Sequence, residues 1–297
     1  MCGIAGEIGN KVQSSYDFIK PMTRVMTHRG PDSEGYYVNQ YCNMGMRRLS
    51  ILDLKTGNQP MSNEDGSVVT IFNGEIYNHI QLRKELHNHT FTTLSDTEVI
   101  VHAYEQWGIE FVKKLDGMFA LALWDDKNKM LIVCRDRIGK KPLYYYFDGK
   151  LLLFGSEIKA ILQHPAYKKV ANVAAIYHYL TYQYVPEPLT AFHSIYALMP
   201  ARYMIYKPEI ENAALVINQY WDFNLPRSEP ENTREIVMAA TRKRLMCDVP
   251  LGVYLSGGID STIVTGCMRS ILGNAGEIHT FSVGFDDEAY NELPYAE

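Results

Sequence analysis

The chain has 297 residues, enough for two domains that each bury a core. Hydrophobic residues make up 46% and charged residues 21%, as in an ordinary soluble globular protein. The net charge is −5 and no basic stripe is present, which argues against nucleic acid as a primary partner. No apolar run approaches the ~18 residues of a membrane span, and no signal-peptide pattern opens the chain.

The five cysteines are an odd number and include no Cys-x-x-Cys spacing. This pattern disfavours both zinc sites and a disulfide framework, and it fits a reducing compartment. We therefore expect a soluble protein of the cytoplasm with no membrane partner.

Short strands and helices alternate through the first part of the chain. Strands are expected at 2–9, 36–38, 44–46, 49–52, 68–72, 118–124, 130–134, 143–147 and 151–155. Helices are expected at 15–26, 78–86, 96–107 and 157–162. The third helix has Ser95 as a candidate N-cap and Glu98 at the capping-box spacing. Antiparallel strands with flanking helices predict a four-layered α+β sandwich.

A new pattern follows a proline-rich stretch that cannot form one regular element. We place one domain at 2–205, a linker at 206–230 and a second domain at 231–297. In the second domain the expected order is a helix at 233–247, a strand at 252–255, a glycine-rich turn, a helix to about 272 and a strand at 278–283. The strand–turn–helix–strand order is a βαβ unit and predicts a parallel sheet.

The turn Ser-Gly-Gly-Ile-Asp-Ser at 256–261 has the composition of an anion site. Two glycines before a helix place backbone N–H groups and the helix dipole around an anion. The Walker pattern GxxxxGK[ST] is absent, which disfavours ordinary γ-phosphate transfer. The carboxylate of Asp260 would repel a phosphate unless Mg²⁺ bridges the two. A purely structural glycine turn is the alternative.

This run resembles the PP-loop of the N-type ATP pyrophosphatases, which adenylate a substrate and release pyrophosphate. The resemblance implies a pyrophosphate pocket lined by Ser256, Gly257, Gly258, Asp260 and Ser261. Asp260 would contact Mg²⁺ through the pyrophosphate. The adenine would lie between Leu255 and Val283.

The first domain begins with Met1-Cys2-Gly3. Removal of Met1 would leave Cys2 with a thiol and a free amine, and an N-terminal nucleophile can use its own amine as general base. A frayed, inert end is the alternative. The chain resembles the class II glutamine amidotransferases, whose mature chains begin Cys-Gly-Ile. The matching segments are 2–4, 28–32, 48–51, 73–78, 95–96, 117–120, 135–139, 142–144 and 156–159.

The resemblance implies that the Cys2 thiolate attacks the side-chain carbonyl of glutamine and releases ammonia. The Asn73 amide and the Gly74 backbone N–H would stabilise the oxyanion. The implied glutamine-binding residues are Arg48, Leu49, Ser50, Ile51, Leu52, Asn73, Gly74, Glu75 and Asp96. Arg48 would hold the α-carboxylate, and the two acidic residues would face the α-ammonium. Arg48 as part of a solvated arginine pair and Asp96 as a helix cap are the alternatives.

The two halves together, with the segment 184–200 between them, resemble the glutamine-hydrolysing asparagine synthetases. The resemblance implies that aspartate and MgATP give β-aspartyl-AMP and pyrophosphate, and that ammonia then displaces AMP. It implies an αββα sandwich of the N-terminal nucleophile hydrolase type, followed by the start of an α/β parallel-sheet PP-loop domain. ATP and Mg²⁺ are expected, but no prosthetic group. Glutamine, aspartate and ATP are the expected partners, and a homodimer is left open.

The second domain is short, since 230–297 holds 68 residues and a doubly wound domain takes roughly 100–150. We expect either a fragment or a natural truncation, in which glutamine hydrolysis survives and asparagine formation does not. One rival is an enzyme of the same layout that amidates another carboxylate. The other rival is a non-catalytic interaction subunit.

Overall fold

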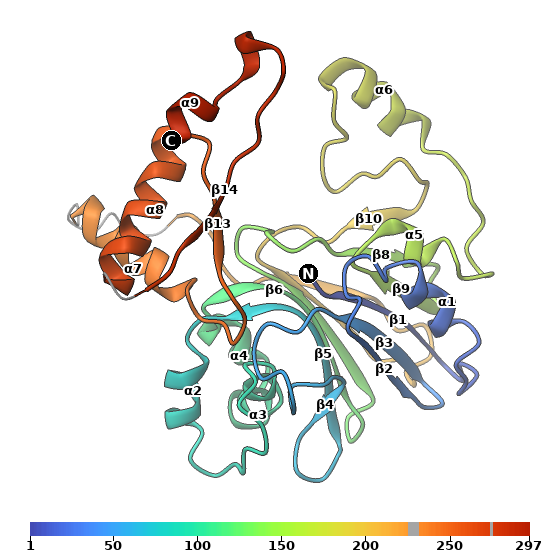
Figure 1. Cartoon of the computed structure of the whole chain (residues 1–297). Coiled ribbons are helices and arrows are strands. Elements are labelled where there is room, and N and C mark those ends of the chain that lie inside the picture. The colour runs from blue at the N-terminus through green and yellow to red at the C-terminus, as the bar shows by residue number, and fades with distance from the viewer. Residues whose placement is uncertain (225–231, 274–275) are drawn as a thin grey trace. The chain divides into compact units, whose positions relative to one another are not determined.

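The computed structural model describes residues 1–224, 232–273 and 276–297. The chain divides into two compact units, Met1–Phe223 and Asn224–Glu297 (Figure 1). Among the described residues, no helix combines the length and the apolar character needed to cross a membrane.

The first unit contains two six-stranded sheets in which every neighbouring pair of strands is antiparallel. The first sheet has the order β10 (Ile195–Ala197), β8 (Tyr144–Phe147), β9 (Leu151–Gly155), β1 (Gly3–Gly9), β3 (Cys42–Arg48) and β2 (Ser33–Val38). The second has the order β12 (Val216–Gln219), β11 (Arg202–Tyr206), β7 (Met130–Arg135), β6 (Gly117–Asp125), β5 (Val68–Ile76) and β4 (Met61–Ser62).

The main core lies between the two sheets because their strands alternate inward and outward side chains. Ile4 and Ile8 of β1 belong to an apolar cluster that also contains Ile71 of β5 and Val133 of β7. Ala5, which points the other way, packs with α1 (Ile19–Arg24) and Ala160 of α5 (Ile158–Ile161). All seven residues of β1 are buried. The strand that follows Cys2 is therefore held on both faces.

Further helices cover the outer face of the second sheet (Figure 1). They are α2 (His79–Glu85), α3 (Glu98–Trp107), the 3₁₀ turn η1 (Gly108–Glu110) and α4 (Phe111–Lys114). Their apolar residues form one cluster with Phe72 and Phe119 of the sheet. Helix, sheet, sheet and helix layers confirm the predicted αββα sandwich.

Several local predictions for the first unit were wrong. Residues 49–52 do not form a strand. The helix expected at 96–107 begins at Glu98, and no side chain caps it. Instead of closing a capping box, Glu98 accepts hydrogen bonds from the backbone N–H groups of Thr92 and Thr93 at 2.7 and 2.8 Å. Glu98 therefore binds the segment just before α3 instead of capping the helix. The sequence also missed β10, β11, β12 and helix α6 (Val173–Tyr182).

The expected linker 206–230 overlaps the first unit. Strand β12 lies within it and pairs with β11, and the hydroxyl of the buried Tyr220 donates to the carbonyl of Arg135 at 3.0 Å. Linker positions 225–230 lie outside the described residues.

The second unit contains the predicted βαβ unit. Its elements are α7 (Thr233–Lys243), β13 (Gly252–Tyr254), α8 (Ile259–Leu272), β14 (His279–Phe281), the 3₁₀ turn η2 (Glu288–Tyr290) and α9 (Leu293–Ala296). β13 and β14 pair in parallel, with Val253 opposite Thr280. Both strands are largely exposed: Tyr254 is 80% and Phe281 58% accessible. The parallel pair confirms the expected parallel sheet of this unit.

Candidate active site

Cys2 lies at the start of β1, next to the segment that follows β3. The backbone N–H of Leu49 donates to the Cys2 Sγ at 3.4 Å. Burial raises the pKa of the Cys2 thiol, and the Leu49 hydrogen bond acts in the opposite direction. Burial also lowers the pKa of the α-amino group of Met1.

The backbone at Cys2 is held by two of the sequence motifs. Nε of Arg29 donates to the Cys2 carbonyl at 2.8 Å, and Nη1 of Arg29 contacts Glu157 at 3.1 Å. His28 Nε2 lies 2.9 Å from the same Glu157 oxygen. The N–H of Ile4 donates to Ser156 Oγ at 3.0 Å. The motifs at 28–32 and 156–159 thus anchor the N-terminal strand.

A narrow cavity of about 30 Å³ opens beside Cys2. It joins residues from β3, β5, the segment after β3 and the segment before α3. The lining residues are Cys2, Arg48, Leu49, Ile51, Leu52, Gly57, Gln59, Phe72, Gly74, Glu75, Ser95, Asp96 and Thr97. Seven of the nine expected glutamine-binding residues are among them, whereas Ser50 and Asn73 are not.

Arg48 is 4% exposed and supplies the cation of the cavity. Its Nη2 donates to the carbonyls of Leu52 and Asp53 at 2.9 and 2.8 Å, and its Nη1 donates to Asn58 Oδ1 at 2.9 Å. These contacts fold the segment after β3 around the guanidinium. The solvated-pair alternative for Arg48 is therefore wrong.

Glu75 and Asp96 supply two carboxyl groups to the same cavity. Burial, and then the nearby Asp96, raises the pKa of Glu75 to about 8. Burial also raises the pKa of Asp96 to about 6, opposed by hydrogen bonds such as that from the Ile76 N–H at 2.8 Å. Two carboxyl groups in one buried site titrate as a pair. A ligand ammonium between them would favour their ionised forms.

Asn73 is 1% exposed. Within the described part of the chain, neither its Nδ2 nor its Oδ1 has a hydrogen-bond partner. A buried amide without a partner is costly unless a ligand satisfies it. Its neighbour Gly74 lines the cavity, and a Cβ there would lie 2.2 Å from the carbonyl oxygen of Met118. A side chain at Gly74 would therefore push β5 away from β6.

Two polar residues near the site were missed by the sequence reasoning. Gln59 lines the cavity and accepts the N–H of Phe72 at 2.6 Å. Lys141 is 6% exposed; burial lowers the pKa of its amine, while the charges of Glu75 and Cys2 act to raise it. Lys141 lies between two matched segments, 135–139 and 142–144, and this position could have identified it as a site residue. No motif in the sequence pointed to Gln59.

The second unit places the expected anion-binding loop between β13 and α8. Ser261 Oγ donates to the Gly258 carbonyl at 3.0 Å and lies 3.2 Å from Ser256 Oγ. Gly257 has φ +75°, and a Cβ there would lie 2.5 Å from the carbonyl oxygen of Tyr295. Asp260 lies in the first turn of α8 and is exposed. The loop thus combines hydroxyl groups, a helix N-terminus and a carboxylate, which is a donor set suited to Mg²⁺ and phosphate oxygens.

The cavity of the first unit presents complementary charges beside a thiol. A guanidinium can bind a carboxylate through two parallel hydrogen bonds, and two carboxylates can hold an ammonium group. A free α-amino acid carries both of these groups. Its side chain would then lie near Cys2 Sγ, the thiol sulfur of the cavity.

Comparison with known families agrees with this geometry. The family described as "Glutamine amidotransferase domain" matches residues 1–221, and the family described as "Asparagine synthase" matches residues 232–297. The solved structure of a glutamine phosphoribosylpyrophosphate amidotransferase from B. subtilis superposes with a TM-score of 0.53 at 17% identity, over 95% of this chain and 65% of that one. This likeness supports the fold alone.

Curated relatives extend over both units. Asparagine synthetase [glutamine-hydrolyzing] 1 of Bacillus subtilis is 34% identical over 100% of this chain and 48% of its own length. Asparagine synthetase [glutamine-hydrolyzing] 2 of the same organism is 38% identical over 95% and 40%. A putative asparagine synthetase of Methanocaldococcus jannaschii is 34% identical over 99% and 62%. The chain spans about half the length of the curated relatives it matches.

Proposed function

Because this chain belongs to the family of glutamine amidotransferase domains, we propose that its first unit hydrolyses glutamine with Cys2 as the nucleophile. The observation that carries the proposal is the single cavity in which Arg48, Glu75 and Asp96 lie beside Cys2. These groups match the two charged groups of a free amino acid. Arg48 would hold the α-carboxylate, and the two acidic residues would hold the α-ammonium.

In the proposed reaction, the Cys2 amine accepts the thiol proton once Met1 has been removed. The sulfur attacks the side-chain carbonyl carbon and forms a tetrahedral oxyanion. Collapse breaks the C–N bond, the amine returns the proton, and ammonia leaves a thioester on Cys2. Water then hydrolyses the thioester to glutamate. We assign oxyanion stabilisation to the Asn73 amide and the Gly74 N–H; losing one such donor typically costs ~10²–10³ in rate.

The remaining expected residues form the walls of this site. Leu49 also donates its N–H to the Cys2 sulfur, so it bears on the position of the nucleophile. The N–H of Ser50 donates to Asp32 Oδ2 at 2.7 Å, which supports a role in fixing this segment. Ile51 and Leu52 supply apolar walls for the methylene groups of the substrate.

For the second unit, we propose binding of the phosphates of ATP. Ser256, Gly257, Gly258 and Ser261 would contact the pyrophosphate, and Asp260 would hold Mg²⁺ against it. Leu255 and Val283 would flank the adenine. The exposed loop between β13 and α8 supports this proposal. Bound Mg²⁺ would neutralise phosphate charge, while the residues of this chain would position the phosphates.

For the protein as a whole, we propose glutamine-dependent amidation of aspartate, as the names of the curated relatives indicate for those proteins. Ammonia released at Cys2 would serve as the nucleophile that displaces AMP from an activated aspartate. The ammonia-releasing part of this reaction would use Cys2, Arg48, Glu75 and Asp96 of the first unit.

The test measures ammonia and glutamate from glutamine alone, for the unaltered chain and for Cys2→Ala. We expect turnover that Cys2→Ala abolishes, with unchanged circular dichroism. Equal turnover in both would reject the nucleophile. A second set of reactions supplies MgATP and ammonia with either aspartate or one of a panel of other carboxylic acids, and measures the pyrophosphate released. Pyrophosphate that appears only with a different carboxylic acid would reject aspartate as the substrate.

A further inference from the structure

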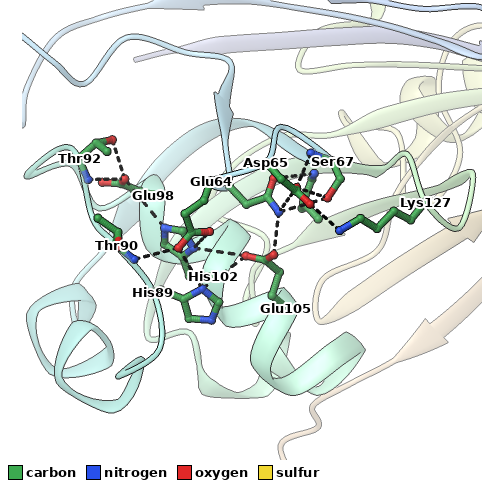
Figure 2. A network of polar contacts seen from close by, with 12 residues as sticks. Glu64, Asp65, Ser67, His89, Thr90, Thr92, Glu98, His102, Glu105 and Lys127 are labelled. Atoms are coloured by element: carbon green, nitrogen blue, oxygen red, sulfur yellow. Dashed lines mark hydrogen bonds and ion pairs between the residues drawn. The ribbon is translucent and has the colours of Figure 1, made fainter.

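Four potential metal ligands converge at one point (Figure 2). None of them lines the cavity that contains Cys2. His102 and Glu105 lie on α3, Glu64 lies between β4 and β5, and His89 lies between α2 and α3. We call these four residues the His–Glu cluster. One ligand atom from each lies within 4.8 Å of the others. The fold thus brings three separate segments to one point.

The spacing of these atoms suits a shared cation. Nδ1 of His102 lies 3.4 Å from Glu105 Oε2 and 3.5 Å from Glu64 Oε2. Nδ1 of His89 lies 3.5 Å from Glu64 Oε1 and 3.6 Å from Glu105 Oε2. Ligand bonds of about 2.0–2.1 Å in a tetrahedron place neighbouring ligand atoms about 3.3–3.4 Å apart. Direct N–H···O bonds have a mode near 2.9–3.0 Å, so these four N···O distances are closer to a tetrahedral edge than to a direct hydrogen bond, while the four ligand atoms as a set lie within 4.8 Å of one another.

Surrounding groups fix the orientation of both carboxylates. Nδ2 of Asn63 donates to Glu105 Oε1 at 2.7 Å, which leaves Oε2 for the cluster. The backbone N–H of Thr90 donates to Glu64 Oε1 at 2.8 Å. Outer hydrogen bonds of this kind are typical of metal sites, where they orient the ligands.

The histidine at the centre of the cluster, His102, is deeply buried. The side chain of His102 is 1% exposed, and Nδ1 is aimed at the two carboxylates of the cluster. Its Nε2 has no hydrogen-bond partner among the described residues, and the nearest carboxylate oxygen of Glu98 is 3.9 Å away. Nδ1 also lies within hydrogen-bonding reach of Glu105 Oε2. A metal on Nδ1 would account for the position of this buried ring beside two acidic groups.

We propose that Glu64, His89, His102 and Glu105 bind one Zn²⁺ ion. Two imidazole nitrogens and two carboxylate oxygens are ordinary zinc ligands, and two carboxylates neutralise the charge of the ion. Four ligands from the protein indicate a structural site. The side chains of Glu64 and Glu105 are 40% and 26% exposed, which gives the ion a route from solvent.

The proposed ion would join the β4–β5 turn and the segment after α2 to α3. That segment continues through Thr92 and Thr93 to Asp96 of the candidate active site. The cysteine spacing argued against a zinc site. That argument could not detect this site, because its ligands are two histidines and two glutamates and include no cysteine. The site is separate from the proposed glutamine hydrolysis and is tested without it.

The experiment titrates the metal-free full chain with Zn²⁺ in a calorimeter, and with Co²⁺ as a spectroscopic probe. We expect one Zn²⁺ per chain. We also expect the visible bands of tetrahedral Co²⁺ without the near-ultraviolet charge-transfer band of a thiolate ligand. A Zn²⁺ concentration about 100 times Kd should raise Tm by about 5–10 °C.

Glu64→Gln and His89→Gln should each weaken Zn²⁺ binding by at least about 100-fold and remove the Tm rise. His87→Gln is the matched control, because His87 is exposed and lies outside the cluster. Both cluster residues are partly accessible, so the variants should fold, as circular dichroism without metal would check. Equal Zn²⁺ affinity in His89→Gln and the unaltered chain, or a thiolate band with Co²⁺, would overturn the proposal.

Discussion

The side chain of Arg29 donates from Nε to the carbonyl oxygen of Cys2 at 2.8 Å. The Arg29 side chain is 9% exposed, and its Nη1 lies 3.1 Å from Glu157 Oε1. A buried guanidinium with a carboxylate partner has a fixed position. The residue that carries the thiol is therefore held through its own backbone by a residue from a different motif.

Arg29→Gln should lower glutamine turnover by roughly 10²-fold, because displacement of a reacting group by about 1 Å can cost that much. Arg24→Gln is the matched control, since Arg24 is an exposed arginine at the end of α1. Ammonia release under saturating glutamine measures the effect. A wild-type rate in Arg29→Gln, with the fold intact, would mean that the contact does not position Cys2.

A chain that keeps Met1, or any residue before Cys2, should release no ammonia from glutamine. The amine of Cys2 is then part of a peptide bond and cannot accept the thiol proton. Mass spectrometry of the N-terminus, combined with the ammonia assay, compares processed and extended chains prepared in the same way. Turnover by a chain whose N-terminus is verified as Met1 would show that another group acts as the base.

Glutamine affinity should increase as the pH rises from about 6 to about 8. The pKa of Asp96 is raised to about 6 and that of Glu75 to about 8, and only ionised carboxylates attract the α-ammonium. KM for glutamine, measured across this range, is expected to fall as the pH rises. Glu75→Gln should raise KM and weaken the pH dependence. A flat KM profile in the unaltered chain would count against the assigned role.

The same pair predicts the opposite trend for stability without substrate. The folded pKa of Glu75, about 8, is above its ordinary value of 4.5, so the folded chain binds more protons than the unfolded chain between these values. The free energy of unfolding contributed by Glu75 is therefore lost as the pH rises from about 4.5 to 8. Urea titrations of Glu75→Gln should show a smaller loss over this interval than the unaltered chain. An identical pH slope would contradict the prediction.

Arg135 and Glu187 connect the sandwich to the segment that follows α6. Arg135 Nη1 contacts both oxygens of Glu187 at 3.1 Å and donates to the Leu198 carbonyl at 2.6 Å. The Glu187 side chain is 39% exposed, so solvent screens the ion pair. Glu187→Gln should lower the free energy of unfolding by about 1 kcal/mol.

Arg135→Gln should cost more, about 3 kcal/mol, because the 7% exposed guanidinium also binds backbone carbonyls. Denaturant titration measures both variants. Glu110→Gln breaks the exposed Lys113–Glu110 pair and serves as the control, with an expected change within about 0.5 kcal/mol. Equal effects in Glu187→Gln and Glu110→Gln would show that the connection adds nothing to stability.

The local patterns predicted most of the regular structure. Apolar alternation identified β1, β5, β6, β7 and β9, because strands buried on at least one face are periodic in sequence. Secondary structure was predicted less well where tertiary contacts determine the backbone conformation. Residues 49–52 are apolar enough for a strand, yet Arg48 draws the carbonyls of Leu52 and Asp53 onto its guanidinium. Helix α6 was missed, and its Val173 and Leu180 are 77% and 75% exposed.

The sequence by itself determined the family and the αββα fold class, because motif order and strand periodicity are written along the chain; the reactive role of Cys2 stays a prediction. It also placed most of the residues that line the cavity. The tertiary structure alone decided which of these residues are in contact. Arg29 holds the Cys2 carbonyl, Glu75 and Asp96 share one buried space, and four ligands from three segments meet beside α3. Such contacts join residues distant in sequence, and only the packing of the layers fixes their distances.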